Sequence, residues 1–171
     1  LNTGDLNDGD VFNCEKRITA YALEKHSSLK IYPPGSLAIA MYGATIGKLG
    51  MLHFSATVNQ ACCIFSGKSH ITPGFLFYWL LGFRKQIVSM ATGGGQPNIS
   101  QEILRNLRAA CPAPSEQASI SEFLDRETAK IDGLMAEQEK LIALLKEKRQ
   151  AVISHAVTKG LDPTVPMKDS G

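Results

Sequence analysis

Apolar residues recur along Ser115 to Thr158 with the spacing of a long amphipathic helix. The stretch has no proline and a single glycine, and it is rich in Ala, Leu, Glu, Lys and Gln, which favour helix. Steps of four and three residues alternate along it, as in a coiled coil, if three polar residues fill the missing positions. These positions, which we call the seam, are Ile120, Leu124, Glu127, Ile131, Leu134, Gln138, Leu141, Leu145, Lys148 and Val152.

The predicted helix is long compared with the domain that the rest of the chain can build. At about 1.5 Å of rise per residue it extends roughly 65 Å, about twice the width of such a domain. We therefore expect a projecting coiled-coil helix whose apolar seam residues pair with another helix, because the chain offers no second helix of similar length. A helix folded back on its own domain is the alternative, but the preceding region has only short elements to receive it.

The region before this helix predicts a small α+β domain with a sheet of short strands. Alternation over 37–41 and the apolar runs at 49–54 and 57–65 predict three strands, and short connections favour antiparallel pairing. On the third strand Val58, Gln60, Cys62 and Ile64 are expected to share one face. The segment 1–13 predicts at most an edge strand, and 107–111 predicts a last short strand.

Capping residues mark the expected helices. Thr19 to Ser27 predicts a short helix, and Thr72 followed by Pro73 starts a helix that runs to about Ala91 and covers the sheet. Ser100 caps a third helix that ends near Asn106. The long helix is expected to begin at Ser115 or at Ser119, which forms a capping box with Glu122, and to stop at Gly160. The predicted parts are a domain over 1–112, the helix over 115–159 and a polar tail over 160–171.

Composition indicates a soluble, folded protein, with 44% hydrophobic and 20% charged residues. No apolar run reaches membrane-spanning length and no secretory signal is visible, so we expect a cytoplasmic protein with reduced cysteines. The chain starts at Leu1, which suggests processing or a longer parent chain. The spacing of the cysteines and histidines fits no zinc site; these residues are Cys14, Cys62, Cys63, Cys111, His26, His53, His70 and His155.

Charge divides between the two predicted parts. Up to Pro112 there are ten Lys and Arg against six Asp and Glu, a net charge of +4. From Ala113 onward eight basic residues stand against ten acidic ones, a net charge of −2. This division suits a polyanionic partner for the first part and protein partners for the helix.

The segment Gly43 to Lys48 has the look of a phosphate-binding loop but fails as one. Only three residues separate its glycines where four are needed, and Leu49 stands where a magnesium-binding Ser or Thr belongs. A tight turn between two strands is the better interpretation. Tyr42, Thr45 and Lys48 are then placed to project from the turn toward a DNA phosphate or base edge.

The segment Thr92 to Asn98 is a glycine-rich loop that lacks the preceding strand of a dinucleotide site. Gln96 and Asn98 within it carry the side chains best suited to bidentate contact with adenine. A loop ordered only for folding remains an equal alternative. The sequence shows no catalytic constellation, and Gln96-Pro97-Asn98 does not match the motif of an adenine methyltransferase.

Several motifs together resemble type I restriction–modification DNA specificity (S) subunits. Pro34-Gly-Ser-Leu-Ala-Ile-Ala, Tyr42-Gly-Ala-Thr-Ile-Gly-Lys-Leu-Gly, Val58-Asn-Gln-Ala-Cys and Gln96-Pro-Asn-Ile-Ser resemble one target recognition domain of that family. Pro114-Ser-Glu-Gln, Phe123-Leu-Asp, Lys130-Ile-Asp and the segment from Leu141 to Pro163 resemble its spacer helix. A complete subunit of this family has two such domains and two such helices, so the chain resembles one half, either a half-subunit or the C-terminal half of a longer subunit.

The resemblance implies a non-catalytic chain that reads one half of a split double-stranded DNA target. Its partners would be methyltransferase (M) subunits, which hold S-adenosylmethionine and flip an adenine, and a motor-nuclease (R) subunit. Two copies would associate through antiparallel long helices. The candidate DNA-contacting residues are Tyr42, Thr45, Lys48, Asn59, Gln60, Gln96 and Asn98, and the candidate helix-pairing residues are Ile120, Leu124, Ile131, Leu134, Leu141, Leu145 and Val152. A coiled-coil adaptor whose domain binds protein or ligand is the alternative.

Overall fold

Residues 1–67, 70–93, 97–162, 164 and 166 are described by the structure, a computed structural model. The chain divides into two compact units, Leu1–Leu124 and Asp125–Gly171. The first unit contains the short helices and strands, and the second contains most of helix α5, Pro114–Lys159. The expected α+β class and the expected long helix are confirmed.

Within the described residues the first unit is built on a four-stranded sheet in the order β1-β3-β2-β4. The strands are β1 (Gly9–Val11), β2 (Leu37–Ala40), β3 (Leu49–Leu52) and β4 (Cys62–Phe65). β2 pairs antiparallel with both β3 and β4, as the short connections predicted. β1 instead runs parallel to β3, so the sheet is mixed and the prediction of an antiparallel sheet is wrong at this edge. The long segment between β1 and β3, which includes α1 (Ala20–Lys25) and β2, allows this arrangement.

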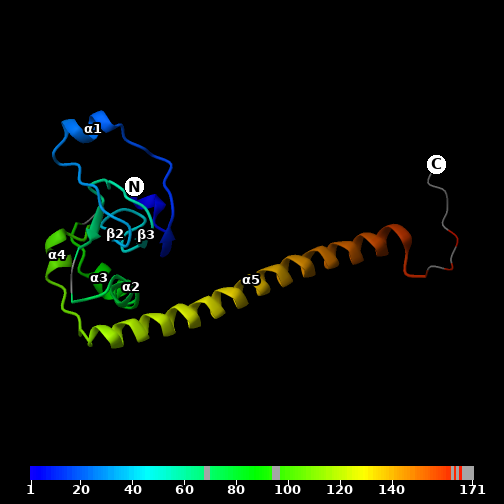
Figure 1. Ribbon diagram of the computed structural model, residues 1–171. Helices are drawn as coiled ribbons and strands as arrows, with labels where there is room; N and C mark the ends of the chain where they lie inside the picture. The colour runs from blue at the N-terminus through cyan, green and yellow to red at the C-terminus, as the bar shows by residue number, and fades with distance from the viewer. Residues whose placement is uncertain (68–69, 94–96, 163, 165, 167–171) are drawn as a thin grey trace. The chain divides into compact units, whose positions relative to one another are not determined.

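Both faces of the sheet are buried, which explains why β2 is apolar throughout. Alternate residues of β2 face opposite sides, so Leu37 and Ile39 join one hydrophobic cluster while Ala38 and Ala40 join another. The first cluster contains Leu80 of α2 (Pro73–Gly82) and Ile87 of α3 (Arg84–Ser89), so these helices cover that face (Figure 1).

The helix predicted from Thr72 to about Ala91 is interrupted. α2 ends at Gly82, and Phe83 adopts φ −95° and ψ 10° before α3 begins. Thr72 precedes the helix as expected, with Pro73 in the first turn, but its side chain makes no capping hydrogen bond. The apolar pattern continued through the break because both helices face the same cluster.

The other short helices begin where the capping residues predicted. The Thr19 hydroxyl accepts the Ala22 N–H of α1 at 3.1 Å. The Ser100 hydroxyl accepts the Ile103 N–H of α4 (Gln101–Arg105), also at 3.1 Å. The expected edge strand near the N-terminus is confirmed as β1, preceded by the 3-10 helix η1 (Thr3–Asp5).

Two strand predictions are wrong in extent. The third strand begins only at Cys62, because the chain turns at Asn59, whose carbonyl accepts the Cys62 N–H at 3.1 Å; Val58 and Gln60 therefore lie outside β4. The segment 107–111 forms no strand and connects α4 to α5 instead.

The start of α5 differs from the prediction. Pro114 is its first residue, a position at which the backbone N–H that proline lacks would have no acceptor within the helix. Neither Ser115 nor Ser119 is therefore the N-cap. Ser119 lies inside the helix and its hydroxyl donates to the Ser115 carbonyl at 3.1 Å, so the expected capping box with Glu122 is also wrong. At the other end, Gly160 follows the helix with φ +73°, as expected for a stop. Among the residues described, no helix is long and apolar enough to cross a bilayer.

Candidate nucleic-acid interface

The glycine-rich segment after β2 is a tight turn into β3. Gly47 N–H donates to the Ala40 carbonyl at 2.8 Å, and Ala40 N–H donates to the Lys48 carbonyl at 2.9 Å. Gly43 and Gly47 have φ of 81° and 78°, a region that favours glycine. A Cβ on Gly47 would stand 3.0 Å from a methyl of Val88, so the turn is packed closely on α3. The interpretation as a strand-to-strand turn fits this geometry.

The second glycine-rich segment lies beside this turn. Tyr42 and Asn98 form an antiparallel bridge, and Ile99 N–H donates to the Met41 carbonyl at 2.7 Å. Thr92 and Asn98 exchange backbone hydrogen bonds of 3.0 and 2.9 Å, which closes the loop at its base. Two segments separated by some fifty residues of sequence therefore meet at one end of β2.

The turn before β4 reaches the same end of the sheet. Met41 N–H donates to the Ala61 carbonyl at 2.8 Å, next to Gln60, whose side chain is exposed. Asn59 is less available, because its side-chain oxygen accepts the Ala61 N–H at 3.2 Å. We call the polar residues gathered here the strand-end surface; they are Tyr42, Thr45, Lys48, Gln60 and Asn98.

The structure thus brings together most of the candidate DNA-contacting residues. Asn98 and Gln60 are exposed, whereas Tyr42, Thr45 and Lys48 are half-buried. Gln96 lies outside the described residues. Contact of any of these residues with DNA stays a prediction.

An ion pair between Asp8 and Arg84, which the sequence did not predict, stabilises the turn on the side of α3. Asp8, which has a positive φ of 66°, accepts the Leu49 N–H at 2.9 Å and pairs with the guanidinium of Arg84 through both oxygens. Arg84 also packs beside Gly47, with its Cγ 3.2 Å from the place of a Cβ there. The pair therefore links the N-terminal segment, β3 and α3 behind the turn. The Asn-Asp-Gly run at 7–9 signals a turn but not its partner.

Neighbouring cysteines on β4 face opposite sides of the sheet, as expected. Cys62 belongs to one hydrophobic cluster and Cys63 packs against the other. Burial raises the pKa of the Cys62 thiol to about 11, and burial also raises the pKa of Cys63. Both are structural residues. The part of the chain that the structure describes holds no group of three His, Cys, Asp or Glu placed to bind a metal.

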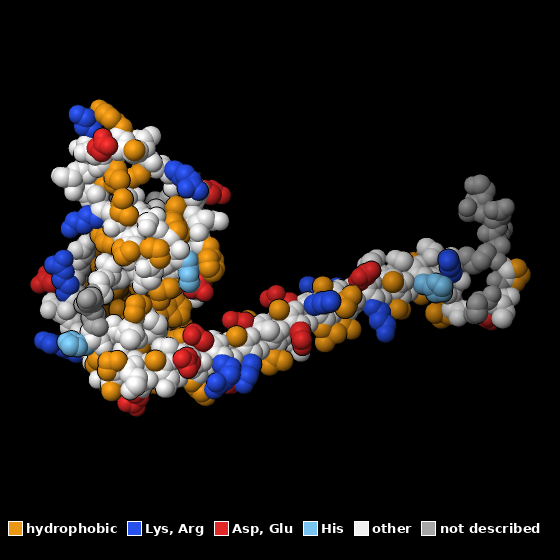
Figure 2. Space-filling model, viewed as in Figure 1, with side chains coloured by type: hydrophobic (Ala, Val, Ile, Leu, Met, Phe, Trp, Pro, Cys, Tyr) orange, Lys and Arg blue, Asp and Glu red, His pale blue; other side chains and the backbone are white. Residues whose placement is uncertain are grey.

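A buried amide attaches the start of α5 to the first unit. Gln117 is fully buried; its Oε1 accepts the Thr72 N–H at 2.8 Å, and its Nε2 donates to the carbonyls of His70 at 2.8 Å and Pro112 at 2.9 Å. Beyond this anchor, large apolar side chains of α5 are exposed (Figure 2), including Ile131, Leu134, Leu141, Leu145 and Val152. These five seam residues are therefore available to a partner.

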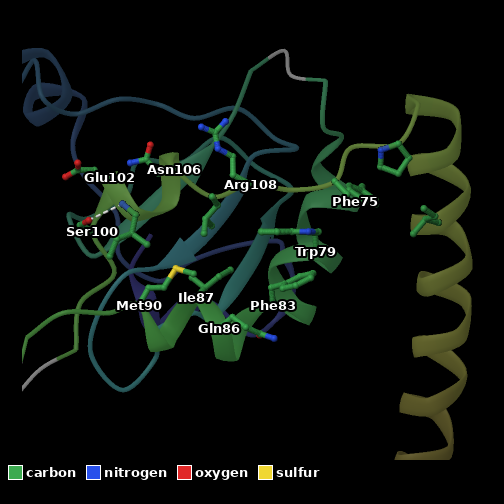
Figure 3. A pocket seen from close by; sticks show the side chains of 15 residues that line it. Phe75, Trp79, Phe83, Gln86, Ile87, Met90, Ser100, Glu102, Asn106 and Arg108 are labelled. Atoms are coloured by element: carbon green, nitrogen blue, oxygen red, sulfur yellow. Dashed lines mark hydrogen bonds between the residues drawn. The ribbon is translucent and has the colours of Figure 1, made fainter.

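The first unit also carries an apolar groove that the sequence did not predict. It encloses about 890 Å³ between α2, α3, α4 and the start of α5 (Figure 3). Trp79 and Phe83 stack within it with ring centroids 4.8 Å apart, and Met90 lies across the hollow. The only signal in the sequence was an apolar content in 73–91 larger than one sheet-facing side requires.

Comparison with known proteins gives a consistent result. Residues 1–143 match a family model described as the type I restriction modification DNA specificity domain. The chain is 35% identical over 168 residues to the type I restriction enzyme EcoDI specificity subunit of Escherichia coli, covering 92% of this chain and 35% of that protein. It is 28% identical over 131 residues to the EcoKI specificity subunit of E. coli strain K12, covering 72% of this chain and 28% of that protein.

Solved structures share the fold. A chain from a structure concerned with assembly and conformational transition of the type I R-M system matches with a TM-score of 0.75, at 18% identity, over 94% of this chain and 38% of that one. The HsdS subunit from Thermoanaerobacter tengcongensis matches with a TM-score of 0.63, at 19% identity, over 92% of this chain and 36% of its own. The chain spans about a third of the length of the curated relatives it matches. It belongs to the family of type I restriction modification DNA specificity domains.

Proposed function

We propose that this chain reads one half of a split DNA target through the strand-end surface. The observation that carries the proposal is the backbone pairing of Tyr42 with Asn98 and of Met41 with Ala61, which gathers polar residues from three separate segments at one end of the sheet. Hydrogen-bonding side chains on a rigid scaffold can be held in register with base edges. The net charge of +4 up to Pro112 favours the approach to phosphates.

The long helix has the second role in this proposal. Its exposed apolar residues outside the seam dock methyltransferase subunits, which supply S-adenosylmethionine and modify adenine, and a motor-nuclease subunit joins for cleavage. This chain contributes target choice and spacing to the complex, in the cytoplasm. Family membership supports the assignment, while the details of docking rest on the exposure of α5.

The seam favours antiparallel pairing of two copies of the chain. When two copies of the helix run antiparallel and are centred on Ala136, each of the ten seam positions lies opposite a seam position of the second copy. Each pair joins two different heptad positions, as in antiparallel coiled coils, and two-fold symmetry makes every contact twice. The pairs are Ile120 with Val152, Leu124 with Lys148, Glu127 with Leu145, Ile131 with Leu141 and Leu134 with Gln138.

Charge along the helix favours the same orientation. Residues 114–127 carry four acidic side chains and one basic one, whereas 146–159 carry four basic side chains and one acidic one. An antiparallel pair places the acidic segment of each copy beside the basic segment of the other, and a parallel pair would place like charges together. Glu127 and Lys148 lie in consecutive layers of the antiparallel pair, within reach of each other across the interface.

Methylation of a random DNA library tests the proposal. The chain is co-expressed with the methyltransferase subunit of its own system, and methylated adenines are located by sequencing. We expect a split target with two identical, oppositely oriented halves, since a symmetric dimer presents the same surface twice. An asymmetric split target would contradict self-pairing and would indicate that a second, different recognition domain reads the other half. A stable complex that methylates no DNA would contradict the proposal that this chain reads DNA.

A further inference from the structure

The apolar groove on the first unit lies where the seam begins. Ile120, the first seam residue, lines the groove together with Phe75 and Trp79 of α2. Phe83 and Met90, which also line it, are 46% and 50% exposed. Exposed apolar residues that form one continuous hollow are typical of a docking site. A partner helix lying on the seam would therefore reach the groove at its end.

The position of Ile120 relative to the groove is fixed by the contacts one turn earlier. Gln117 is held by backbone groups of Thr72, His70 and Pro112, and Ser121 lies close enough to Gly74 that a Cβ there would stand 3.3 Å from its hydroxyl. The first turns of α5 are thus packed on the N-terminal end of α2. Ile120, the first seam residue, therefore forms part of the groove wall.

We propose that this groove receives the C-terminal turns of α5 from a second copy of the chain, with Val152 entering beside Ile120 and Trp79. The inference rests on the self-pairing proposed above. In the antiparallel arrangement Val152 of the second copy is opposite Ile120, which lines the groove. Val152 is 59% exposed in its own chain, so it has apolar surface to bury.

The second copy suits the groove in charge as well as in shape. The segment that enters, 146–159, has a net charge of +3, and the helix beside the groove, 114–127, has a net charge of −3. The groove is mostly apolar with a polar rim that includes Glu102, Asn106 and Arg108. The proposed contact therefore buries an apolar residue where two helix segments of opposite net charge lie side by side, an arrangement that favours a specific interface.

Tryptophan fluorescence tests the proposal, because Trp79 is the one tryptophan in the sequence and lines the groove. The full chain is diluted from tens of micromolar to nanomolar while sedimentation follows the dimer. We expect the emission of Trp79 to shift to longer wavelength with the same midpoint as dissociation, since the departing helix exposes the ring to water.

Two pairs of variants locate the contact. Val152→Glu should weaken the dimer at least tenfold and abolish the shift, whereas Leu161→Glu, an exposed residue beyond the end of α5 and outside the entering segment, should change neither. On the groove side, Met90→Lys should weaken the dimer, whereas Ile18→Lys, a similarly exposed residue outside the groove, should not. Circular dichroism confirms that each variant is folded.

The outcomes separate this inference from the proposed self-pairing. A dimer that forms while Trp79 emission stays constant and Met90→Lys has no effect would leave self-pairing intact and overturn the groove contact. A chain that stays monomeric at tens of micromolar would overturn both. A shift that appears only when the methyltransferase subunit is added would assign the groove to that protein and reject the second copy as its occupant.

Discussion

Gln117 illustrates how a single residue can join two parts of a fold. Its side chain is fully buried and hydrogen-bonded to backbone groups from two other segments. The amide therefore supplies the hydrogen bonds that water would make to these groups if α5 did not cover them. Buried backbone groups that lose their partner each cost about 1–3 kcal/mol. The motif Pro114-Ser-Glu-Gln could be read in the sequence, but the contacts of Gln117 with Thr72 and His70 could not, because these partners lie more than forty residues away.

Replacement of Gln117 should therefore destabilise the first unit. Gln117→Ala leaves the Thr72 N–H and the His70 carbonyl unsatisfied, and we expect a loss of about 2–4 kcal/mol in the free energy of unfolding measured with urea. Glu116→Ala, an exposed neighbour on the same turn, is the matched control and should change little. Equal stability of the two variants would show that α5 is not anchored through this amide.

Lys48 and Asn98 should affect DNA binding in different ways. Lys48→Ala removes a charge suited to phosphate, so it should weaken binding to all sequences about equally, whereas Asn98→Ala should relax choice at one base pair by about 1–3 kcal/mol. Binding to the methylated target and to single-base variants of it, measured by fluorescence anisotropy, separates the two effects. Lys25→Ala in α1 is the control for loss of charge. If Asn98→Ala kept the full sequence preference, the strand-end surface would be wrongly placed.

The cysteines provide a test of burial. The thiolate is the reactive form, and burial raises the pKa of Cys62 to about 11, so at pH 8 its thiol stays protonated as well as enclosed. We expect a thiol reagent to label exposed Cys111 first and Cys62 last, with the reactivity of Cys62 rising as pH increases toward 11. In denaturant all four should react alike. Fast labelling of Cys62 in the folded chain would contradict the packing of β4.

At the scale of elements, sequence patterns located most helices and strands, and they failed where tertiary contacts decide. The alternation over 37–41 predicted β2, and Ser100 predicted the start of α4, because both signals are local. The parallel pairing of β1 with β3 depends on where a distant segment docks. The break at Phe83 and the groove beside it were missed since a continuous apolar run does not say how many surfaces it covers.

The pairing of α5 allows a test by charge exchange. Glu127 has its own neighbours, accepting from Lys130 at 2.9 Å, but in the antiparallel pair it also approaches Lys148 of the second copy. We expect Glu127→Lys and Lys148→Glu each to weaken the dimer about tenfold, because exposed pairs contribute about 0.2–1 kcal/mol and symmetry repeats the contact. The double variant should recover most of the loss, measured by sedimentation at low salt. Additive losses in the double variant would reject this register.

At the scale of the whole molecule, the division of charge can be predicted directly from the sequence, whereas the DNA sequence of the target cannot. The net charges of +4 and −2 on the two parts follow from counting residues, and the family could be inferred from motifs along nearly the whole chain. The bases that are read depend on side-chain positions at the strand-end surface, which three segments distant in sequence determine together. The sequence of any one segment therefore does not determine which bases are read.

Salt dependence tests whether two copies act on one DNA. Each phosphate contact releases counterions, so the logarithm of the binding constant falls linearly with the logarithm of salt concentration, with a slope set by the number of contacts. A dimer that engages both half-targets makes every contact twice. We therefore expect the wild-type chain on the full split target to show about twice the slope of Leu134→Glu, a change at the centre of the seam that should hold the chain as a monomer.

The same titration distinguishes the rival functions, because each predicts a different slope. On a single half-target the wild-type chain and Leu134→Glu should have equal slopes, since one copy binds in either case; this comparison controls for any effect of the variant on the strand-end surface. Equal slopes on the full target would mean that the dimer uses only one of its two surfaces. A slope near zero on every DNA would favour a coiled-coil adaptor, whose protein contacts release few counterions.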